Sequence, residues 1–152
     1  MRSLVLLLCI SYVAGDAAYV NKKFCRDVDQ SQCTIHNVIV DPCIKGNTFC
    51  AMKRNKNYVV TLDVVPRFSA SKLKLSISAD VDNSGNFTTS VKAPSEACNL
   101  LYCPLEAGQR RIFDATVALD KRAMGKFPLK VKLWNEDDES KGCCVTFSVK
   151  VK

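Results

Sequence analysis

The sequence predicts an all-β protein in which two antiparallel sheets pack face to face as a sandwich. Five stretches alternate apolar and polar residues with a period of two, as half-buried antiparallel strands do. These stretches are residues 58–68, 72–80, 111–120, 127–133 and 144–152. Turn-forming residues separate them, and no window of about eleven residues has convincing helical periodicity. Roughly seven or eight strands are expected, a number that suits two packed sheets.

Each alternating stretch has one apolar face, which we expect to point between the sheets. The inward positions are Leu62, Val64, Leu75, Ile77, Phe113, Val117, Phe127, Val131, Phe147 and Val149. No charged residue has the inward parity. The sequence therefore predicts an interior of aliphatic and aromatic side chains that contains no buried charge.

The N-terminus has the layout of a secretory signal peptide. Arg2 precedes an apolar run from Leu4 to Ala14, and small residues that suit cleavage follow. The run is too short for a membrane-spanning helix. We expect residues 1–16 to be removed and residues 17–152, which suffice for one domain of ordinary size, to fold as a single unit.

The cysteines predict a disulfide framework. Eight of the nine lie beyond the expected signal peptide, at positions 25, 33, 43, 50, 98, 103, 143 and 144. An even number in a secreted chain indicates paired cysteines, although eight of them allow 105 pairings. A zinc site is not expected, because the closely spaced thiolate pairs of such sites are missing and the compartment is oxidising.

Residues that would support catalysis are missing from the sequence. His36 is the single histidine, and it lies in a strand-like run with the parity of a solvent-facing residue. No nucleophile elbow, phosphate-binding loop or dinucleotide fingerprint occurs. The acidic run at 136–139 lacks the ligand spacing of a calcium loop and suits a solvated turn. We expect neither an enzyme nor a cofactor or metal.

The net charge of +7, or +6 without Arg2, has two interpretations. Lysines mostly occupy outward strand positions, at 72, 74, 130, 132, 150 and 152. They could form a basic face for anionic membranes or glycolipids. They could instead serve solubility and protect strand edges, which is the interpretation we favour. Mixed basic and aromatic clusters are lacking, so no nucleic-acid partner is expected.

The predicted layout is immunoglobulin-like, but the chain lacks the marks of an immunoglobulin domain. In such a domain a tryptophan packs on a disulfide that bridges the two sheets. The only tryptophan here, Trp134, lies nine residues before Cys143. The short-range cysteine pairs also differ from the immunoglobulin spacing.

Several segments, in order, resemble the ML lipid-recognition domain family, which includes the mite group 2 allergens and the Niemann–Pick type C sterol-transfer proteins. The segments are KKFC at 22–25, VIVDPC at 38–43, EACNLLYCPLEAGQ at 96–109 and FPLKV at 127–131, followed by an acidic turn, a cysteine and an alternating final strand. The resemblance covers nearly all of the chain beyond the signal peptide. The set is specific in combination, although no single segment would suffice.

This resemblance implies three disulfides. They are a long bridge, for which Cys25–Cys144 fits best, and the short bridges Cys43–Cys50 and Cys98–Cys103. Cys33 and Cys143 are additional to the family pattern, and we expect them to form a fourth bridge. Because adjacent cysteines on a strand point to opposite faces, the partners of Cys143 and Cys144 could be exchanged.

The resemblance also implies a hydrophobic cavity between the sheets that holds a sterol, a fatty acid or another lipid in a secreted or lysosomal monomer. The nine inward residues above other than Phe127 would form its walls, although core packing explains them equally well. The implied mouth consists of Phe87, Val91, Met124, Phe127 and Pro128. Asn86 begins the only N-glycosylation sequon, and a glycan there would sit near the mouth. Two alternatives are innate-immunity recognition of a bacterial glycolipid and an allergen-like structural module without a ligand.

Overall fold

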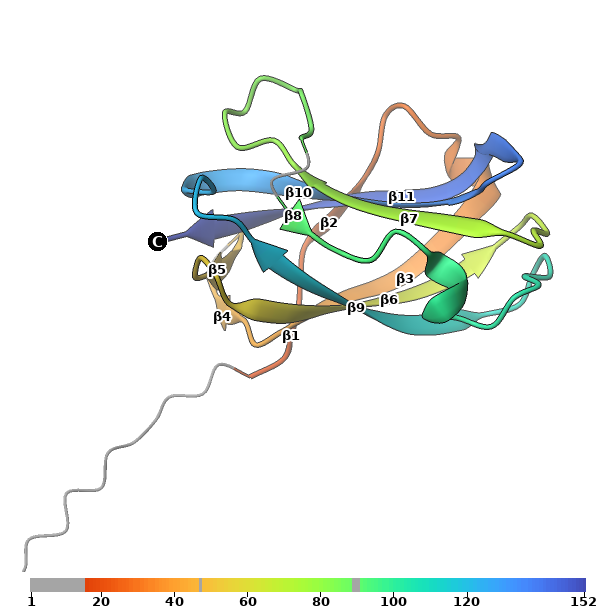
Figure 1. The fold of residues 1–152 in the computed structure, drawn as a ribbon, viewed down its shortest axis with the longest axis horizontal. Coiled ribbons are helices and arrows are strands. Elements are labelled where there is room, and N and C mark those ends of the chain that lie inside the picture. The colour runs from red at the N-terminus through yellow and green to blue at the C-terminus, as the bar shows by residue number, and fades with distance from the viewer. Residues whose placement is uncertain (1–15, 47, 89–90) are drawn as a thin grey trace, which may run out of the picture.

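The computed structural model describes residues 16–46, 48–88 and 91–152, and in them the chain forms a sandwich of two stacked sheets (Figure 1). The expected signal peptide, except for Asp16, lies outside the described residues. The helical elements in the described part are two single turns of 3-10 helix, η1 (Gln30–Gln32) and η2 (Ala97–Asn99). None of the described helices has the length and apolar character needed to span a membrane.

The first sheet has five strands in the order β1-β3-β6-β9-β8, and every neighbouring pair is antiparallel. Its strands are β1 (Ala18–Tyr19), β3 (Cys33–Asp41), β6 (Asn57–Pro66), β8 (Val91–Lys92) and β9 (Arg111–Leu119). The predicted alternation is confirmed in β6 and β9, where the inward parity is buried. His36, on β3, is exposed, as its parity predicts.

The second sheet has the order β4-β5-β11-β10-β7, and β2 also pairs with β11. Its strands are β2 (Lys22–Phe24), β4 (Ile44–Lys45), β5 (Cys50–Met52), β7 (Leu73–Ala79), β10 (Gly125–Asn135) and β11 (Asp138–Val151). The prediction of two antiparallel sheets needs one correction, because β5 runs parallel to β11. β2 and β5 pair with successive parts of the same edge of β11, one antiparallel and one parallel.

The strand registers define two ends of the sandwich. At the bridge end, the Cys33–Cys143 disulfide joins the start of β3 in the first sheet to β11 in the second. At the loop end lie the turn 53–56 that precedes β6, the loop 120–124 between β9 and β10, and the C-terminus (Figure 1). The acidic turn between β10 and β11 is at the bridge end, since Asn135 pairs with Asp138.

The four disulfides are Cys25–Cys144, Cys43–Cys50 and Cys98–Cys103, which the resemblance implies, and Cys33–Cys143, which we expected from the two additional cysteines. The last of these closes the loop around η2, which packs against β7. Next to this loop, Ala70 and Leu105 exchange backbone hydrogen bonds of 3.0 and 2.8 Å. Three of the four bridges therefore lie toward the bridge end.

Candidate functional site

The nine residues predicted as cavity walls come together in one apolar cluster between the sheets. The first sheet contributes Leu62, Val64, Phe113 and Val117, and the second contributes Leu75, Ile77, Val131, Phe147 and Val149. Each of the nine is between 0 and 4% exposed. The interior is thus a continuous hydrocarbon surface supplied by both sheets.

Buried polar side chains of the described residues do not interrupt this surface. Asp63 and Asp80 alternate away from the interior, because the neighbouring Leu62 and Ala79 point into it. Asn135 lies at the end of β10, where its Oδ1 accepts a hydrogen bond of 3.0 Å from the backbone N–H of Asp137. The interior therefore offers hydrophobic contact and no charge to anything that enters it.

The five predicted mouth residues do not form one lip. Phe127 and Val91 are buried in the interior, and Val91 pairs with Leu119 at the loop end. Met124 is 56% exposed in the loop before β10. Pro128 follows Phe127 on a strand and so points to the outer face, where Phe87 also lies. The predicted mouth residues are therefore divided between the interior, the outer face of the second sheet and an exposed loop.

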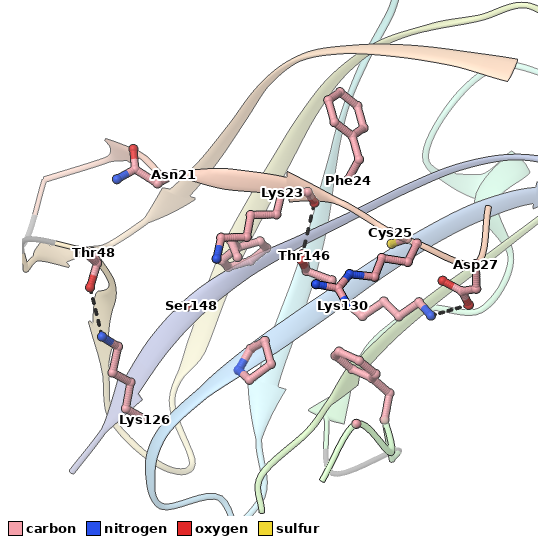
Figure 2. A pocket seen from close by; sticks show the side chains of 15 residues that line it. Asn21, Lys23, Phe24, Cys25, Asp27, Thr48, Lys126, Lys130, Thr146 and Ser148 are labelled. Carbon is pink, nitrogen blue, oxygen red and sulfur yellow. Dashed lines mark hydrogen bonds and ion pairs between the residues drawn. The ribbon is translucent and has the colours of Figure 1, made fainter. Parts of the chain in front are cut away.

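A pocket of about 750 Å³ lies on the outer face of the second sheet (Figure 2). Its floor is formed by outward residues of β10 and β11, and its sides come from β2, from the segment that follows it and from two loops. The lining residues include Lys23, Phe24, Arg26, Asp27, Thr48, Phe87, Lys126, Pro128, Lys130, Thr146 and Ser148. Sequence reasoning missed this pocket, because it combines short segments from distant parts of the chain that have no periodicity.

Two of the four cations that line this pocket, Lys126 and Lys130, contact other side chains of the chain. Lys130 Nζ lies 2.7 Å from Asp27 Oδ2 and 5.2 Å from the centre of the Phe87 ring. The hydrogen bond from Lys130 lowers the pKa of the Asp27 carboxyl below its ordinary value. Lys126 donates a hydrogen bond of 2.9 Å to Thr48 Oγ1 (Figure 2). The pocket is amphipathic, and Asp27 compensates one of its four cationic side chains.

Other lysines on the outer strand faces are paired in the same way. Lys132 forms an ion pair of 2.6 Å with Glu139, and Lys74 forms one with Glu96. The glutamates come from the acidic turn and from the segment before η2, which sequence reasoning did not place near these lysines. The outer face that seemed uniformly basic in the sequence is therefore mixed in charge.

The sequon residue Asn86 is exposed in the loop between β7 and β8. Asp80 shapes this loop, because its carboxylate accepts hydrogen bonds of 2.9 Å from the backbone N–H groups of Ser84 and Gly85. Gly85 has a φ of 91°, a conformation that glycine adopts without strain. A glycan at Asn86 would project beside the outer pocket, which Gly85 and Phe87 line.

Comparison with known proteins agrees with this architecture. The family described as the ML domain matches residues 20–151. A protein of Manduca sexta named MD-2-related lipid-recognition protein is 29% identical over 129 residues, which are 84% of this chain and 82% of that protein. The crystal structure of a Niemann-Pick type C2 protein from Japanese carpenter ant superposes with a TM-score of 0.63 at 18% identity, and covers 78% of this chain and 91% of that one.

The ML match runs from the β1–β2 region to the last residue of β11, so it includes both sheets and all eight paired cysteines. The similarity to the carpenter-ant protein extends to the fold. The chain therefore belongs to the ML domain family.

Proposed function

We propose that this protein binds a lipid and holds its hydrocarbon part between the two sheets. The observation that carries the proposal is the charge-free interior, to which both sheets contribute equally apolar faces. Membership of the ML domain family supports it, as does the name of the Manduca relative, which describes lipid recognition. A ligand that buries about 15 methylene groups would gain about 12 kcal/mol of transfer free energy before the costs of association.

The sheets can part at the loop end to admit such a ligand. The named strands of one sheet do not pair with those of the other, so side-chain packing holds the interior together. The Cys33–Cys143 bridge fixes the opposite end. Parting the sheets exchanges contacts between side chains for contacts with hydrocarbon, which are similar in strength.

Sterols and fatty acids are the ligand classes that fit best. Each combines a long or flat hydrocarbon body with one small polar group, which would remain at the loop end while the body fills the interior. The protein would act as a carrier and not as an enzyme. The four disulfides favour a secreted protein or one of the lysosomal lumen, since such bridges persist in oxidising compartments. We propose that it works as a monomer.

Recognition of a bacterial glycolipid by the strand lysines has less support. Lys130 and Lys132 would be the recognising groups, but both are paired with carboxylates of this chain at 2.7 and 2.6 Å. An anionic head group would have to displace Asp27 and Glu139. The apolar interior remains the better-supported site.

The direct test is to identify what the purified protein carries. We expect mass spectrometry of an organic-solvent extract to detect a sterol or fatty acid, and the delipidated protein to take up a fluorescent fatty acid or sterol. An extract without lipid, together with no uptake of either probe, would contradict the proposal.

A matched pair of substitutions separates ligand contact from core packing. Leu62 and Leu105 are each 1% exposed, but Leu62 belongs to the predicted walls and Leu105 lies near the bridge end. Each Leu→Ala change should lower the free energy of unfolding by about 2–5 kcal/mol without lipid. Saturating fatty acid should recover part of the loss for Leu62→Ala only, because the ligand fills that cavity. Equal recovery for both variants would contradict this assignment of the walls.

A further inference from the structure

We propose that the loop end of the sandwich is a docking surface for anionic phospholipid bilayers. This inference goes beyond lipid binding in the interior and does not depend on which ligand is held there. Five basic side chains line one concave surface of about 510 Å³ at this end, together with Asn55. They are Lys53, Arg54, Lys56, Lys121 and Lys152, and all five are exposed.

Hydrogen bonds to backbone carbonyls hold the three segments of this basic cluster together. The N–H of Asn55 donates to the carbonyl of Leu119 at 3.1 Å, and Arg54 Nη1 donates to the carbonyl of Lys121 at 3.2 Å. The N–H of Lys152 donates to the carbonyl of Met52 at 3.3 Å. The turn 53–56, the loop 120–124 and the C-terminus are therefore fixed relative to one another, and the cluster is a built feature of the fold.

The cations of this cluster differ from the strand lysines in their partners. Within the described ranges of the chain, none of its five side chains forms an ion pair with a carboxylate. Asp120 lies in the same loop but is paired with Arg122 at 2.9 Å. The contrast with the paired lysines of the outer strand faces is clear. Five like charges on one concave surface repel one another, and a partner with several negative charges would relieve that repulsion.

An exposed apolar side chain beside the cluster favours a bilayer as the partner. Met124 is 56% exposed and lies three residues after Lys121 in the same loop. The loop is anchored by Ala123, which is buried and whose N–H donates to the Asp120 carbonyl at 3.2 Å. Cations that meet phosphate groups next to an apolar side chain that enters the acyl boundary are typical of membrane-surface contacts. A soluble polyanion would offer the Met124 side chain no apolar environment.

The charge distribution along the molecule would orient it for this contact. The acidic turn of Glu136, Asp137, Asp138 and Glu139 lies at the bridge end. β10 has 11 residues and separates the two ends by about 33 Å at a rise of about 3 Å per residue. Lysines pair with three of the four carboxylates of this turn, whereas the five cations of the basic cluster have no such partner in the described part of the chain, so an anionic surface attracts the loop end more strongly than the bridge end.

Vesicle binding by the full-length protein as purified from cells tests the proposal. The probes are vesicles of phosphatidylcholine alone and of phosphatidylcholine mixed with phosphatidylglycerol, measured by co-sedimentation at low and high salt. We expect binding to the phosphatidylglycerol vesicles only, and loss of that binding in high salt. Lys56→Ala combined with Lys121→Ala should weaken binding by about 25-fold, because each basic side chain near such a surface contributes a factor of about five.

The matched control removes two cations from the bridge end, with Arg67→Ala and Lys72→Ala. Arg67 follows β6 and Lys72 precedes β7, so both lie away from the basic cluster. This control should bind the vesicles like the unmodified protein, and Met124→Ser should weaken binding in the presence of all five cations. Both double variants should take up fluorescent fatty acid normally, so that a failure of the docking proposal is distinguishable from a failure of lipid binding.

Three outcomes would overturn the docking proposal. They are no binding of the unmodified protein to phosphatidylglycerol vesicles, equal weakening by the two double variants, and binding of soluble heparin through Lys56 and Lys121 without any binding to vesicles. The last outcome would assign the basic cluster to a sulfated glycan.

Discussion

At the scale of the residue, Asp63 shows what parity can and cannot predict. Its position on β6 gives it the outward parity, yet it is 5% exposed. Arg110 covers it and donates two hydrogen bonds, of 2.7 Å from Nε and 2.6 Å from Nη2, to the two carboxylate oxygens. These hydrogen bonds lower the pKa of the Asp63 carboxyl below its ordinary value. The direction of the side chain follows from the strand, whereas its burial depends on a residue 47 positions away.

We expect Asp63→Asn to change how stability depends on pH. The folded-state pKa of Asp63 lies below its unfolded value, so its contribution is fully present above about pH 4 and is lost as the pH falls through the folded-state pKa. At neutral pH Asp63→Asn should be less stable than the unmodified protein, and the difference should shrink in acid. Urea unfolding followed by Trp134 fluorescence between neutral pH and about pH 3 measures this.

A double-mutant cycle controls for the loss of Asp63 itself. Arg110→Gln should destabilise the unmodified protein at neutral pH more than it destabilises the Asp63→Asn variant. Only in the unmodified protein does this substitution break an ion pair with the Asp63 carboxylate. Equal effects in the two backgrounds, or a gap that widens in acid, would show that the ion pair does not contribute in this way.

At the scale of the element, β11 organises the molecule. It is the longest strand, with 14 residues, and it pairs with β10 along one edge and with β2 and β5 along the other. Adjacent residues on a strand point to opposite faces, so Cys143 reaches β3 across the interior while Cys144 reaches Cys25 just after β2. Two neighbouring cysteines thereby attach one strand to both the facing sheet and its own neighbour.

The two long bridges should be partly redundant. When one bridge is intact, it already joins the two distant parts of the chain. The second bridge then closes a ring of only about eleven residues, which consists of residues 25–33 and 143–144. Replacing one pair with serine should then cost about 3 kcal/mol of unfolding free energy. Replacing both pairs should cost about 8 kcal/mol, because a loop of over a hundred residues is then released as well.

Urea unfolding of Cys25→Ser/Cys144→Ser, of Cys33→Ser/Cys143→Ser and of the combined variant tests this redundancy. A combined variant that fails to fold agrees with the expectation. A combined loss no larger than the sum of the two separate losses would contradict it.

The elements that sequence could predict are the ones long enough to show a period. β6, β7, β9, β10 and β11 follow the alternation of the sequence closely. β1, β4 and β8 have two residues each, too few for any pattern, and the parallel pairing of β5 with β11 depends on the path of the chain. The basic cluster was not predicted, because its cations lie in turns. The pairing of Lys130 with Asp27 joins residues 103 positions apart.

At the scale of the whole molecule, a disulfide joins the two sheets at one end of the sandwich, whereas loops and hydrogen bonds join them at the other. The Cys33–Cys143 bridge locks the sheets together near Leu133, which pairs with Cys143. At the loop end the sheets are connected through the loop 120–124 and the turn 53–56. The predicted site is thus a packed core, and under the proposed function a ligand would enter it from the loop end.

The difference between the two ends predicts a gradient of amide hydrogen exchange along the strands of the lipid-free protein. Amides of the same strands should exchange more slowly near the bridge end, around Leu133, than near the loop end, around Leu119 and Phe127. Fatty acid should slow exchange mainly at the loop end, because a bound ligand would make opening of the sheets there less frequent. Uniform protection along β9 and β10, with or without fatty acid, would contradict opening at one end.

The position of Lys152 in the basic cluster has a practical consequence for anyone who attaches a label after this residue. A purification tag or fluorescent protein fused there would shield the neighbouring cations, and an acidic tag would neutralise them. The exposed turn at Glu136 and Asp137 lies at the other end of β10, so it is the place where a small reporter would leave the loops unobstructed.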